Sequence, residues 1–189
     1  MVLFVERTEF CLPHEKFKVT QRPCPFYDER PDEHDVNLLV VHNISLPAGE
    51  FGTEHVDALF TGNINCKAHP SFVDLEGLKV SAHCFIRRDG QVLQYVPFNK
   101  RAWHAGVSEY KGRACCNDFS IGIELEGTDT TPYTDAQYVT LVESARYIMQ
   151  LYPKITTSGI VGHCDIAPGR KTDPGEAFDW QKFLTLLNK

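Results

Sequence analysis

Three short apolar runs along the chain have the length and composition of buried β-strands. They cover residues 37–42 (NLLVVH), 119–125 (FSIGIEL) and 159–163 (GIVGH). Strands that are buried on both faces are nearly continuous runs of Val, Ile and Leu rather than alternating patterns. We therefore predict three central strands, and the first and last of them end in a histidine.

A hairpin and two helices are predicted from the same kind of pattern. The runs 80–87 and 91–96 flank the sequence RDG, and Asp-Gly between two such runs is a strong hairpin signal. Residues 135–152 carry apolar side chains at helical spacing, behind a T-x-x-Q capping box and ahead of Pro153. A last helix is expected over roughly 179–188.

Two segments lack a clear period. Residues 11–35 are rich in proline and charge, so we expect residues 1–35 to form an irregular leader packed on the domain. Residues 43–79 contain Pro and Gly punctuation and one short apolar stretch, which predicts a long, partly helical excursion of the kind that is usually functional. The sum is a single α+β domain over residues 1–189, with a central sheet of about four or five strands and helices packed on it.

Composition limits the classes of protein that fit. The chain has 189 residues, 42% hydrophobic and 23% charged, as expected for one soluble domain. Its net charge of −6 argues against general nucleic-acid binding. No segment has the pattern of a membrane span or of a signal peptide. Seven cysteines without regular spacing indicate reduced thiols, so we expect a cytoplasmic protein.

Polar residues at the predicted strand ends supply the candidate chemistry. His42 and His163 end two strands, Glu124 lies near the end of the third, and Asp173 follows in the Pro- and Gly-punctuated loop 164–175. Catalytic zinc takes three protein ligands and leaves a fourth position for water. Two imidazoles and the Asp173 carboxylate satisfy that requirement, and Glu124 could take the proton of the water as a general base.

Lys171 lies two residues before Asp173. On an extended segment residues i and i+2 point to the same side, so Lys171 could stabilise the oxyanion of a tetrahedral intermediate. Spacing alone leaves other interpretations open. Asp173 before Pro174 could be a turn residue, and Glu124 and Glu126 could be two solvated residues on one strand.

Other imidazoles and thiols are candidates too. His83 and His104 are further possible ligands. A metal-free thiol hydrolase using Cys164 or Cys84 would need an accessible thiolate, and only its adjacency to His163 supports Cys164 in such a role or as a ligand. The plainer interpretation is that four of the cysteines are packed thiols, namely Cys84, Cys115, Cys116 and Cys164.

Eight sequence blocks in a fixed order cover about residues 25–185: LLVVHNISLPAGEFG (38–52), DALFTG (57–62), VSAHCFIRRDG (80–90), QYVPFNKRAWHAGVS (94–108), CNDFSIGIELEGTDT (116–130), YTDAQY (133–138), GHCDIAP (162–168) and RKTDPG (170–175). In these blocks the chain resembles the zinc N-acetylmuramyl-L-alanine amidases, which are related to phage lysozyme-amidases and peptidoglycan recognition proteins. Within that group it is most similar to the cytosolic AmpD-type anhydro-muramyl-peptide amidases.

The resemblance implies a mixed β-sheet flanked by helices and a zinc cofactor. It implies His42, His163 and Asp173 as zinc ligands, Glu124 as the acid/base carboxylate and Lys171 as the catalytic lysine. The implied reaction is cleavage between the lactyl group of N-acetylmuramic acid and the L-alanine of the peptide. The implied substrates are anhydro-muramyl peptides that return to the cytoplasm during cell-wall recycling, including inducers of β-lactamase in bacteria with such a system.

Four residues are predicted to anchor the substrate: Asn43, Lys79, Trp103 and Arg170. The chain departs from its relatives at two basic positions. Lys79 stands in place of an arginine and lacks the fork that binds a carboxylate in two places, and Cys115 replaces another basic residue. If these positions hold the carboxylates of the peptide, we expect its affinity to differ.

Two alternatives use the same scaffold. A muropeptide-binding module without catalysis tends to have lost a metal ligand, whereas this chain keeps all three. A secreted autolysin would need export, and no signal peptide is visible. We expect a monomer that binds a small muropeptide, with neither nucleic acid nor membrane as a partner.

Overall fold

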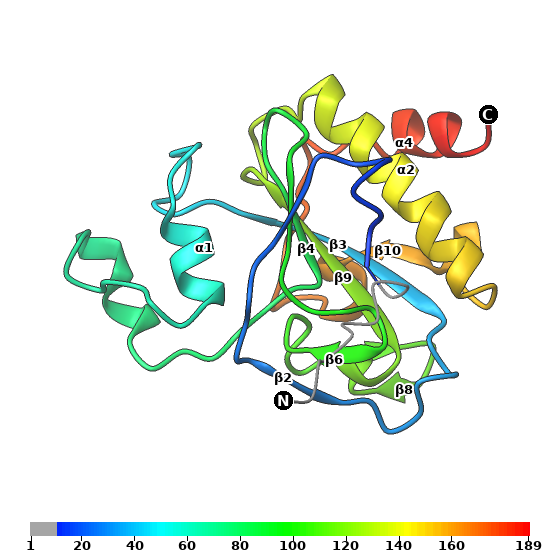
Figure 1. The fold of residues 1–189 in the computed structure, drawn as a ribbon, viewed down its shortest axis with the longest axis horizontal. Coiled ribbons are helices and arrows are strands. Elements are labelled where there is room, and N and C mark those ends of the chain that lie inside the picture. The colour runs from blue at the N-terminus through cyan, green and yellow to red at the C-terminus, as the bar shows by residue number, and fades with distance from the viewer. Residues whose placement is uncertain (1–10) are drawn as a thin grey trace, which may run out of the picture.

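The computed structural model describes residues 11–189 and places the two longest strands side by side at the centre of a mixed sheet (Figure 1). The six strands of this sheet, in spatial order, are β1 (Val19–Gln21), β5 (Val92–Gln94), β4 (Cys84–Ile86), β9 (Ser120–Glu126), β3 (Leu38–Ile44) and β10 (Ile160–Gly162).

The directions of the strands confirm a mixed sheet. β4 and β5 form the expected antiparallel hairpin, whereas β4, β9, β3 and β10 run parallel to one another and β1 is parallel to β5. The central sheet has six strands rather than the expected four or five, because the edge strand β1 was not predicted. Its residues Val19, Thr20 and Gln21 are half-buried or exposed, so they show no apolar run.

The leader is less irregular than expected. Besides β1 it contains β2 (Tyr27–Glu29), which pairs antiparallel with β6 (Lys100–Ala102), while residues 1–10 lie outside the described part of the chain. All three residues of β2 are exposed, which explains why a hydrophobic pattern did not reveal it. A further two-stranded pair joins β7 (Glu109–Tyr110) to β8 (Arg113–Ala114).

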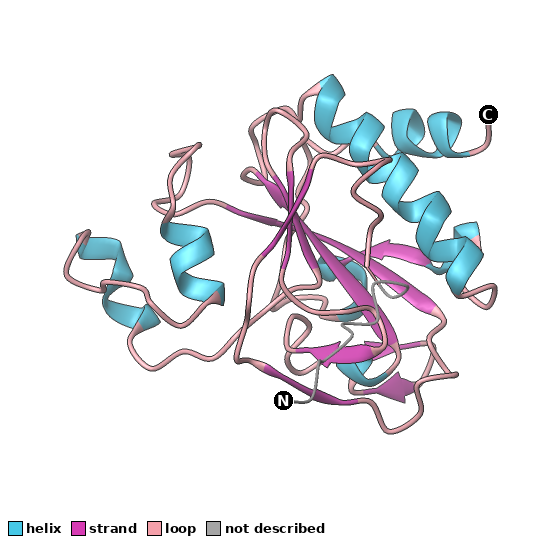
Figure 2. Cartoon of the chain, viewed as in Figure 1, coloured by secondary structure: helices cyan, strands magenta, loops and turns pink. Residues whose placement is uncertain are grey.

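Helices cover both faces of the central sheet (Figure 2). The helices and single-turn 3₁₀ segments are α1 (His55–Phe60), η2 (Pro70–Leu75), η3 (Cys116–Asp118), α2 (Asp135–Leu151), η4 (Thr157–Gly159), α3 (His163–Ile166) and α4 (Trp180–Leu187). The two predicted long helices, α2 and α4, are confirmed to within one residue at each end. Within residues 11–189 no helix has the length and apolar character needed to span a membrane.

Alternate residues of β3 enter different cores. Leu39 and Val41 share a cluster with apolar residues of α2 and α4. Leu38 and Val40 belong to a second cluster, on the other face, with Ile166 of α3. Because side chains alternate along a strand, the residue that follows Val41 is presented on the second face.

The excursion over residues 43–79 contains α1 and η2, as expected, and extends away from the sheet at the left of Figure 1. Asp57 of α1 is its main polar tie to the body. Its carboxylate accepts hydrogen bonds from the Arg22 guanidinium at 3.0 and 2.8 Å and from the Tyr95 hydroxyl at 3.0 Å.

The start of α2 is fixed by the predicted capping box. The Thr134 hydroxyl accepts from the Gln137 backbone N–H at 3.1 Å, and the Gln137 side chain accepts from the Thr134 N–H at 3.1 Å. The Thr134 hydroxyl also donates to the backbone carbonyl of Arg88 at 2.7 Å, which ties α2 to the β4–β5 hairpin.

Replacing this cap tests how much it stabilises the fold. We expect Thr134→Ala to lower the free energy of unfolding by about 1 kcal/mol, because the Gln137 N–H loses its acceptor and the Arg88 carbonyl loses its donor. Thr185→Ala on the exposed side of α4 is the matched control and should change it by less than about 0.5 kcal/mol. Urea denaturation measures the free energy of unfolding of both variants. Equal losses in Thr134→Ala and Thr185→Ala would contradict a stabilising role for the Thr134 cap.

Candidate metal centre

The parallel ladder between β3 and β9 brings the first two predicted site residues together. His42 pairs with Glu124 in this register, so their side chains lie on the same face of neighbouring strands. His42 is not at a strand tip as predicted, since β3 continues to Ile44. Both side chains are buried.

His163 begins the helical turn α3 instead of ending a strand, which corrects the sequence prediction. β10 stops at Gly162, whose backbone N–H donates to the Asp165 carboxylate at 2.7 Å. The loop after α3 then returns, because the Cys164 N–H donates to the carbonyl of Asp173 at 3.0 Å. This contact places Asp173 beside His163.

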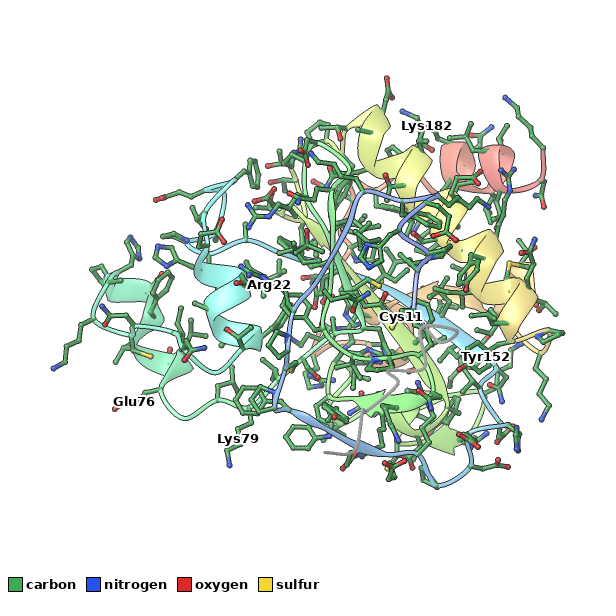
Figure 3. The ribbon with its side chains drawn as sticks, viewed as in Figure 1. Cys11, Arg22, Glu76, Lys79, Tyr152 and Lys182 are labelled. Atoms are coloured by element: carbon green, nitrogen blue, oxygen red, sulfur yellow. The ribbon has the colours of Figure 1, made fainter. Side chains whose placement is uncertain are left out.

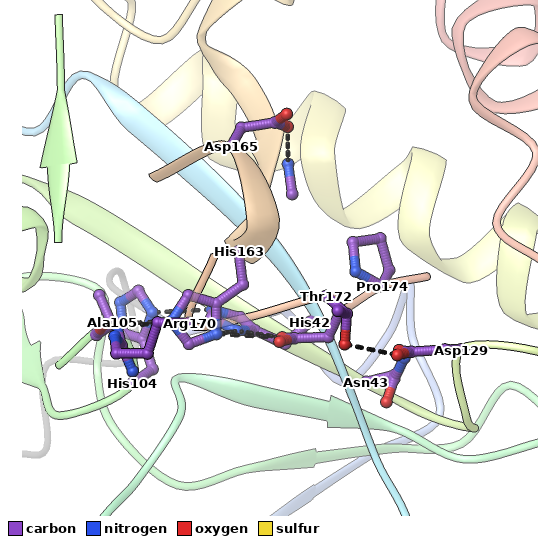
Figure 4. A network of polar contacts seen from close by, with 12 residues as sticks. His42, Asn43, His104, Ala105, Asp129, His163, Asp165, Arg170, Thr172 and Pro174 are labelled. Carbon is purple, nitrogen blue, oxygen red and sulfur yellow. Dashed lines mark hydrogen bonds and ion pairs between the residues drawn. The ribbon is translucent and has the colours of Figure 1, made fainter. Parts of the chain in front are cut away.

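The three predicted ligands converge (Figure 4). Oδ2 of Asp173 lies 3.0 Å from Nδ1 of His42 and 3.1 Å from Nδ1 of His163. The two Nδ1 atoms are 3.0 Å apart, and all three atoms lie within 4.8 Å of one another. Asp173 is therefore more than a turn residue.

The donor set fits a zinc ion. Nε2 of His163 lies 3.1 Å from the carbonyl of Ala105, which can only accept, so this nitrogen carries the proton and Nδ1 presents a lone pair. Two imidazole nitrogens and one carboxylate oxygen at one point are the ligands of catalytic zinc sites. Within residues 11–189 this is the group that could hold a metal, and Cys164 is not part of it.

Electrostatics at the site favour the metal-binding forms of the ligands. Burial lowers the pKa of His42 to about 4, so the imidazole is neutral at pH 7. Burial opposes ionisation of Asp173, but hydrogen bonds with His163 and His42 hold the pKa of its carboxyl below the usual range. Neutral imidazoles and a carboxylate are the protonation states that bind zinc.

Glu124 is buried, and its Oε2 atom has no hydrogen-bond partner in the described chain. Burial, with the nearby charge of Asp173, raises the pKa of Glu124 well above its ordinary value, whereas the charge of Lys171 lowers it. Glu126 is also buried and accepts from the N–H groups of Gly52 and Arg88 at 2.5 and 3.0 Å. The interpretation of the two glutamates as solvated residues is therefore wrong.

The side chain of Lys171 is exposed, and its ammonium group makes no hydrogen bond or ion pair with residues 11–189, whereas its backbone N–H donates to the carbonyl of Ala167 at 3.0 Å. Its charge acts on both Glu124 and His42. An exposed ammonium group whose charge reaches the buried carboxyl group of Glu124 is an arrangement that can move protons and stabilise negative charge.

A cavity of about 580 Å³ opens beside the ligands. Asn43 and Arg170 line it together with Lys171, Asp173 and the loop 127–130. The Asn43 Nδ2 group donates to the carboxylate of Asp129 at 2.8 Å.

Arg170 is already engaged with the protein. Its Nη2 group donates to the carbonyls of Ala105 and Val107 at 2.7 and 2.6 Å, across Gly106. Gly106 adopts a φ of +58°, and a side chain there would begin 3.4 Å from the guanidinium. Arg170 thus fixes the loop that carries Ala105, the partner of His163.

The other two predicted anchors lie elsewhere. Lys79 lines a second cavity, of about 610 Å³, below the excursion, and Figure 3 shows its side chain pointing outward. Trp103 stacks on Phe26, a lining residue of that cavity, with ring centroids 6.3 Å apart. The structure therefore groups Asn43 with Arg170, and Lys79 with Trp103.

The remaining candidates separate clearly. His83 accepts from the Gly122 N–H at 3.0 Å and does not reach the ligands, whereas His104 Nδ1 lies 2.9 Å from His42 Nε2. The six cysteines from Cys24 to Cys164 are free thiols. Cys115 is exposed, so its interpretation as a packed thiol is wrong. Burial raises the pKa of the thiols of Cys84 and Cys164, which disfavours a reactive thiolate.

Asp129 is a site residue that the sequence analysis did not single out. It accepts from Asn43 through one oxygen and from the Thr172 hydroxyl, at 2.5 Å, through the other. It therefore joins β3 to the loop that carries Asp173. Its only sequence signal was its place in the block GTDT, which has no metal-ligand or acid/base spacing.

Comparison with known proteins agrees with this geometry. The family model described as N-acetylmuramoyl-L-alanine amidase matches residues 32–176. The 1,6-anhydro-N-acetylmuramyl-L-alanine amidase AmpD of Escherichia coli K12 is 64% identical over 167 residues, 88% of this chain and 91% of that protein.

Solved structures show the same fold. A selenomethionine AmpD crystal structure superimposes with a TM-score of 0.90 at 58% identity, over 95% of this chain and 97% of that one. The amidase AmiD from E. coli, in complex with the substrate anhydro-N-acetylmuramic acid-L-Ala-D-γ-Glu-L-Lys, gives a TM-score of 0.61 at 30% identity, over 80% of this chain and 57% of that one. The family match, covering most of the chain, and these relatives identify the chain as a member of the N-acetylmuramoyl-L-alanine amidase family.

Proposed function

We propose that this chain is a zinc-dependent hydrolase that cleaves the amide bond between the lactyl group of 1,6-anhydro-N-acetylmuramic acid and the L-alanine of its peptide. The observation that carries the proposal is the convergence of His42, His163 and Asp173 beside the buried carboxyl group of Glu124. The name of the AmpD relatives and the ligand of the AmiD complex support the anhydro sugar as substrate.

In this proposal His42 and His163 bind zinc through Nδ1, and Asp173 binds it through a carboxylate oxygen. When bound, zinc is a Lewis acid that polarises the scissile carbonyl and acidifies the attacking water. Glu124 takes the proton of that water through its unpartnered oxygen and returns it to the leaving amine. The charge of Lys171 favours the ionised form of Glu124 and stabilises the negative charge that develops on the carbonyl oxygen.

The two cavities suggest a division of substrate contacts. Asn43 and Arg170 lie beside the ligands, so we assign them to the sugar and the scissile amide. Lys79 and Trp103 lie toward the second cavity and suit the peptide. Because Lys79 offers a single ammonium where an arginine would offer a fork, it holds a peptide carboxylate through one contact.

The proposed biological role is peptidoglycan recycling in the cytoplasm by a monomeric enzyme. Hydrolysis there would remove the anhydro-muropeptides that induce β-lactamase in bacteria with such a system. The muropeptide-binding module is disfavoured because all three ligand atoms and the acid/base carboxyl group are in place.

The reaction itself is the first test. Purified protein is incubated with anhydro-muramyl-tripeptide, and free tripeptide is detected by mass spectrometry. We expect release that stops with a zinc chelator and returns with added zinc. Binding without release by zinc-loaded protein would favour the binding module, and chelator-resistant release that thiol alkylation abolishes would favour a cysteine hydrolase.

The role of Lys171 predicts a loss of rate rather than of metal. Lys171→Met should lower kcat by about 10²- to 10³-fold, as expected when one group that stabilises the oxyanion is removed. Zinc content, measured by atomic absorption, should stay at the wild-type level. Lys111→Met, at an exposed turn that is distant from Lys171 in the sequence, is the matched control. An unchanged kcat in Lys171→Met would remove Lys171 from the catalytic machinery.

The burial of Glu124 predicts a pH-dependent stability of the metal-free protein. Its pKa is raised above the ordinary value of 4.5, so the folded chain retains a proton that the unfolded chain has lost, and stability falls as pH rises toward the folded pKa. Glu124→Gln removes this loss. The difference in free energy of unfolding between Glu124→Gln and wild type should therefore grow with pH above 4.5.

Urea denaturation of the metal-free proteins from pH 5 to pH 8 measures this difference. Glu76→Gln, on the exposed loop of the excursion (Figure 3), is the matched control for the loss of a glutamate charge. A flat curve for Glu124→Gln would show that Glu124 titrates normally.

A further inference from the structure

His104 is a buried imidazole for which the reaction proposed above has no use. It follows β6, and its backbone N–H donates to Asn117 Oδ1 at 3.1 Å. Its ring lies over Gly122 of β9, where a Cβ atom would come within 2.5 Å of its Cγ and Nδ1 atoms. The central strand thus has a glycine where the His104 ring needs the space.

Both ring nitrogens of His104 have partners. Nδ1 lies 2.9 Å from Nε2 of His42, and Nε2 lies 3.1 Å from the hydroxyl of Ser120 (Figure 4 shows the first contact). Ser120, Gly122 and Glu124 alternate along β9 on one face, so a single strand supports His104 and carries the acid/base residue. A chain of polar contacts runs from His42 through His104 to Ser120.

The protons in the hydrogen bonds from His42 through His104 to Ser120 can be ordered in two ways. Each neutral imidazole carries one proton, which sits on either of its two ring nitrogens. In one order His42 donates from Nε2 to His104, which donates from Nε2 to Ser120. In the other order Ser120 donates to His104, which donates from Nδ1 to His42, and the His42 proton sits on Nδ1.

The two metal-binding histidines differ in this respect. The carbonyl of Ala105, 3.1 Å from Nε2 of His163, can only accept and places the proton on that nitrogen, while the donor group Nη2 of Arg170 lies farther from it, at 3.5 Å. Nε2 of His42 contacts the imidazole of His104 instead of a carbonyl group, and Nδ1 of that imidazole can accept or donate. A metal ion at Nδ1 of His42 requires the first order, in which His104 accepts the Nε2 proton.

We propose that His104 is a positioning residue that sets the tautomer of His42. Its Nδ1 atom accepts the Nε2 proton of His42, and its own Nε2 proton is donated to the hydroxyl of Ser120. The inference rests on the proposed function, because it assumes that His42 binds zinc through Nδ1. Second partners of this kind orient metal-bound imidazoles and raise their basicity.

Three substitutions at His104 test the proposal. The Oδ1 atom of His104→Asn can take the place of Nδ1 and accept from His42, whereas His104→Leu has a similar size and no acceptor. His104→Gln places its amide near Ser120, at the position of Nε2, and leaves His42 without an acceptor. It keeps a polar group in the site should the leucine variant fail to fold.

Zinc affinity is measured by competition with a chromophoric chelator. We expect His104→Gln and His104→Leu to lower it by about 10- to 100-fold, and His104→Asn to stay within about 3-fold of wild type. Thermal unfolding of the metal-free proteins reports whether each variant is folded. Equal zinc affinities in wild type, His104→Asn and His104→Gln would overturn the proposal.

The tautomer can be observed directly by ¹⁵N NMR of the imidazoles in the zinc-loaded protein. The expected spectrum has His42 and His104 both protonated at Nε2, and a proton on Nδ1 of His104 would contradict the inference. A failure of the proposed function looks different. In that case His42→Ala would bind zinc as tightly as wild type, whatever the substitutions at His104 do.

Discussion

The parallel register between β3 and β9 is the constraint on which the rest of the site depends. It sets His42 beside Glu124 on one face of the sheet. The side chains that alternate with them along β3 and β9 point to the other face and pack into the core beneath α2. A slip by one residue would turn Leu39 and Val41 out of that core and move His42 to the opposite face. The hydrophobic core thus fixes the position of His42, a proposed metal ligand, relative to the carboxyl group of Glu124, the proposed acid/base residue.

The second half of the site is attached to this register by short-range contacts. β10 pairs with β3, so His163 emerges one residue beyond the sheet, next to His42. The hydrogen bond from the Cys164 N–H to Asp173 and the one from Thr172 to Asp129 close the loop over the ligands. Asp173 follows His163 by ten positions in the sequence, yet its Oδ2 atom lies 3.1 Å from Nδ1 of His163.

This arrangement costs stability in the absence of a metal. Glu124 has a buried oxygen without a partner in the described chain, and Asp173 holds a charge in a largely enclosed position between the imidazole rings of His42 and His163. Groups of this kind are found where function requires them, since an apolar core would be more stable. A divalent cation would neutralise the excess negative charge and so couple metal binding to folding.

Much of this could be predicted from the sequence, and the failures share a cause. The central strands, the hairpin, α2 and the three converging ligands came from apolar runs, a capping box and long sequence blocks. The strands β1 and β2 were missed because their side chains are exposed, so no pattern marks them. Asp129 and the chain from His42 to Ser120 depend on which side chains meet across the fold, and no local spacing encodes that.

The separation of the predicted anchors between two cavities bears on how specificity can change in this scaffold. Asn43 and Arg170 are bound to Asp129 and to the backbone that holds His163, so substitutions there would disturb the metal ligands. Lys79 lies on the excursion, at an exposed position remote from those contacts. A substitution at Lys79 can therefore change the charge at the wall of the second cavity without moving the groups proposed for catalysis.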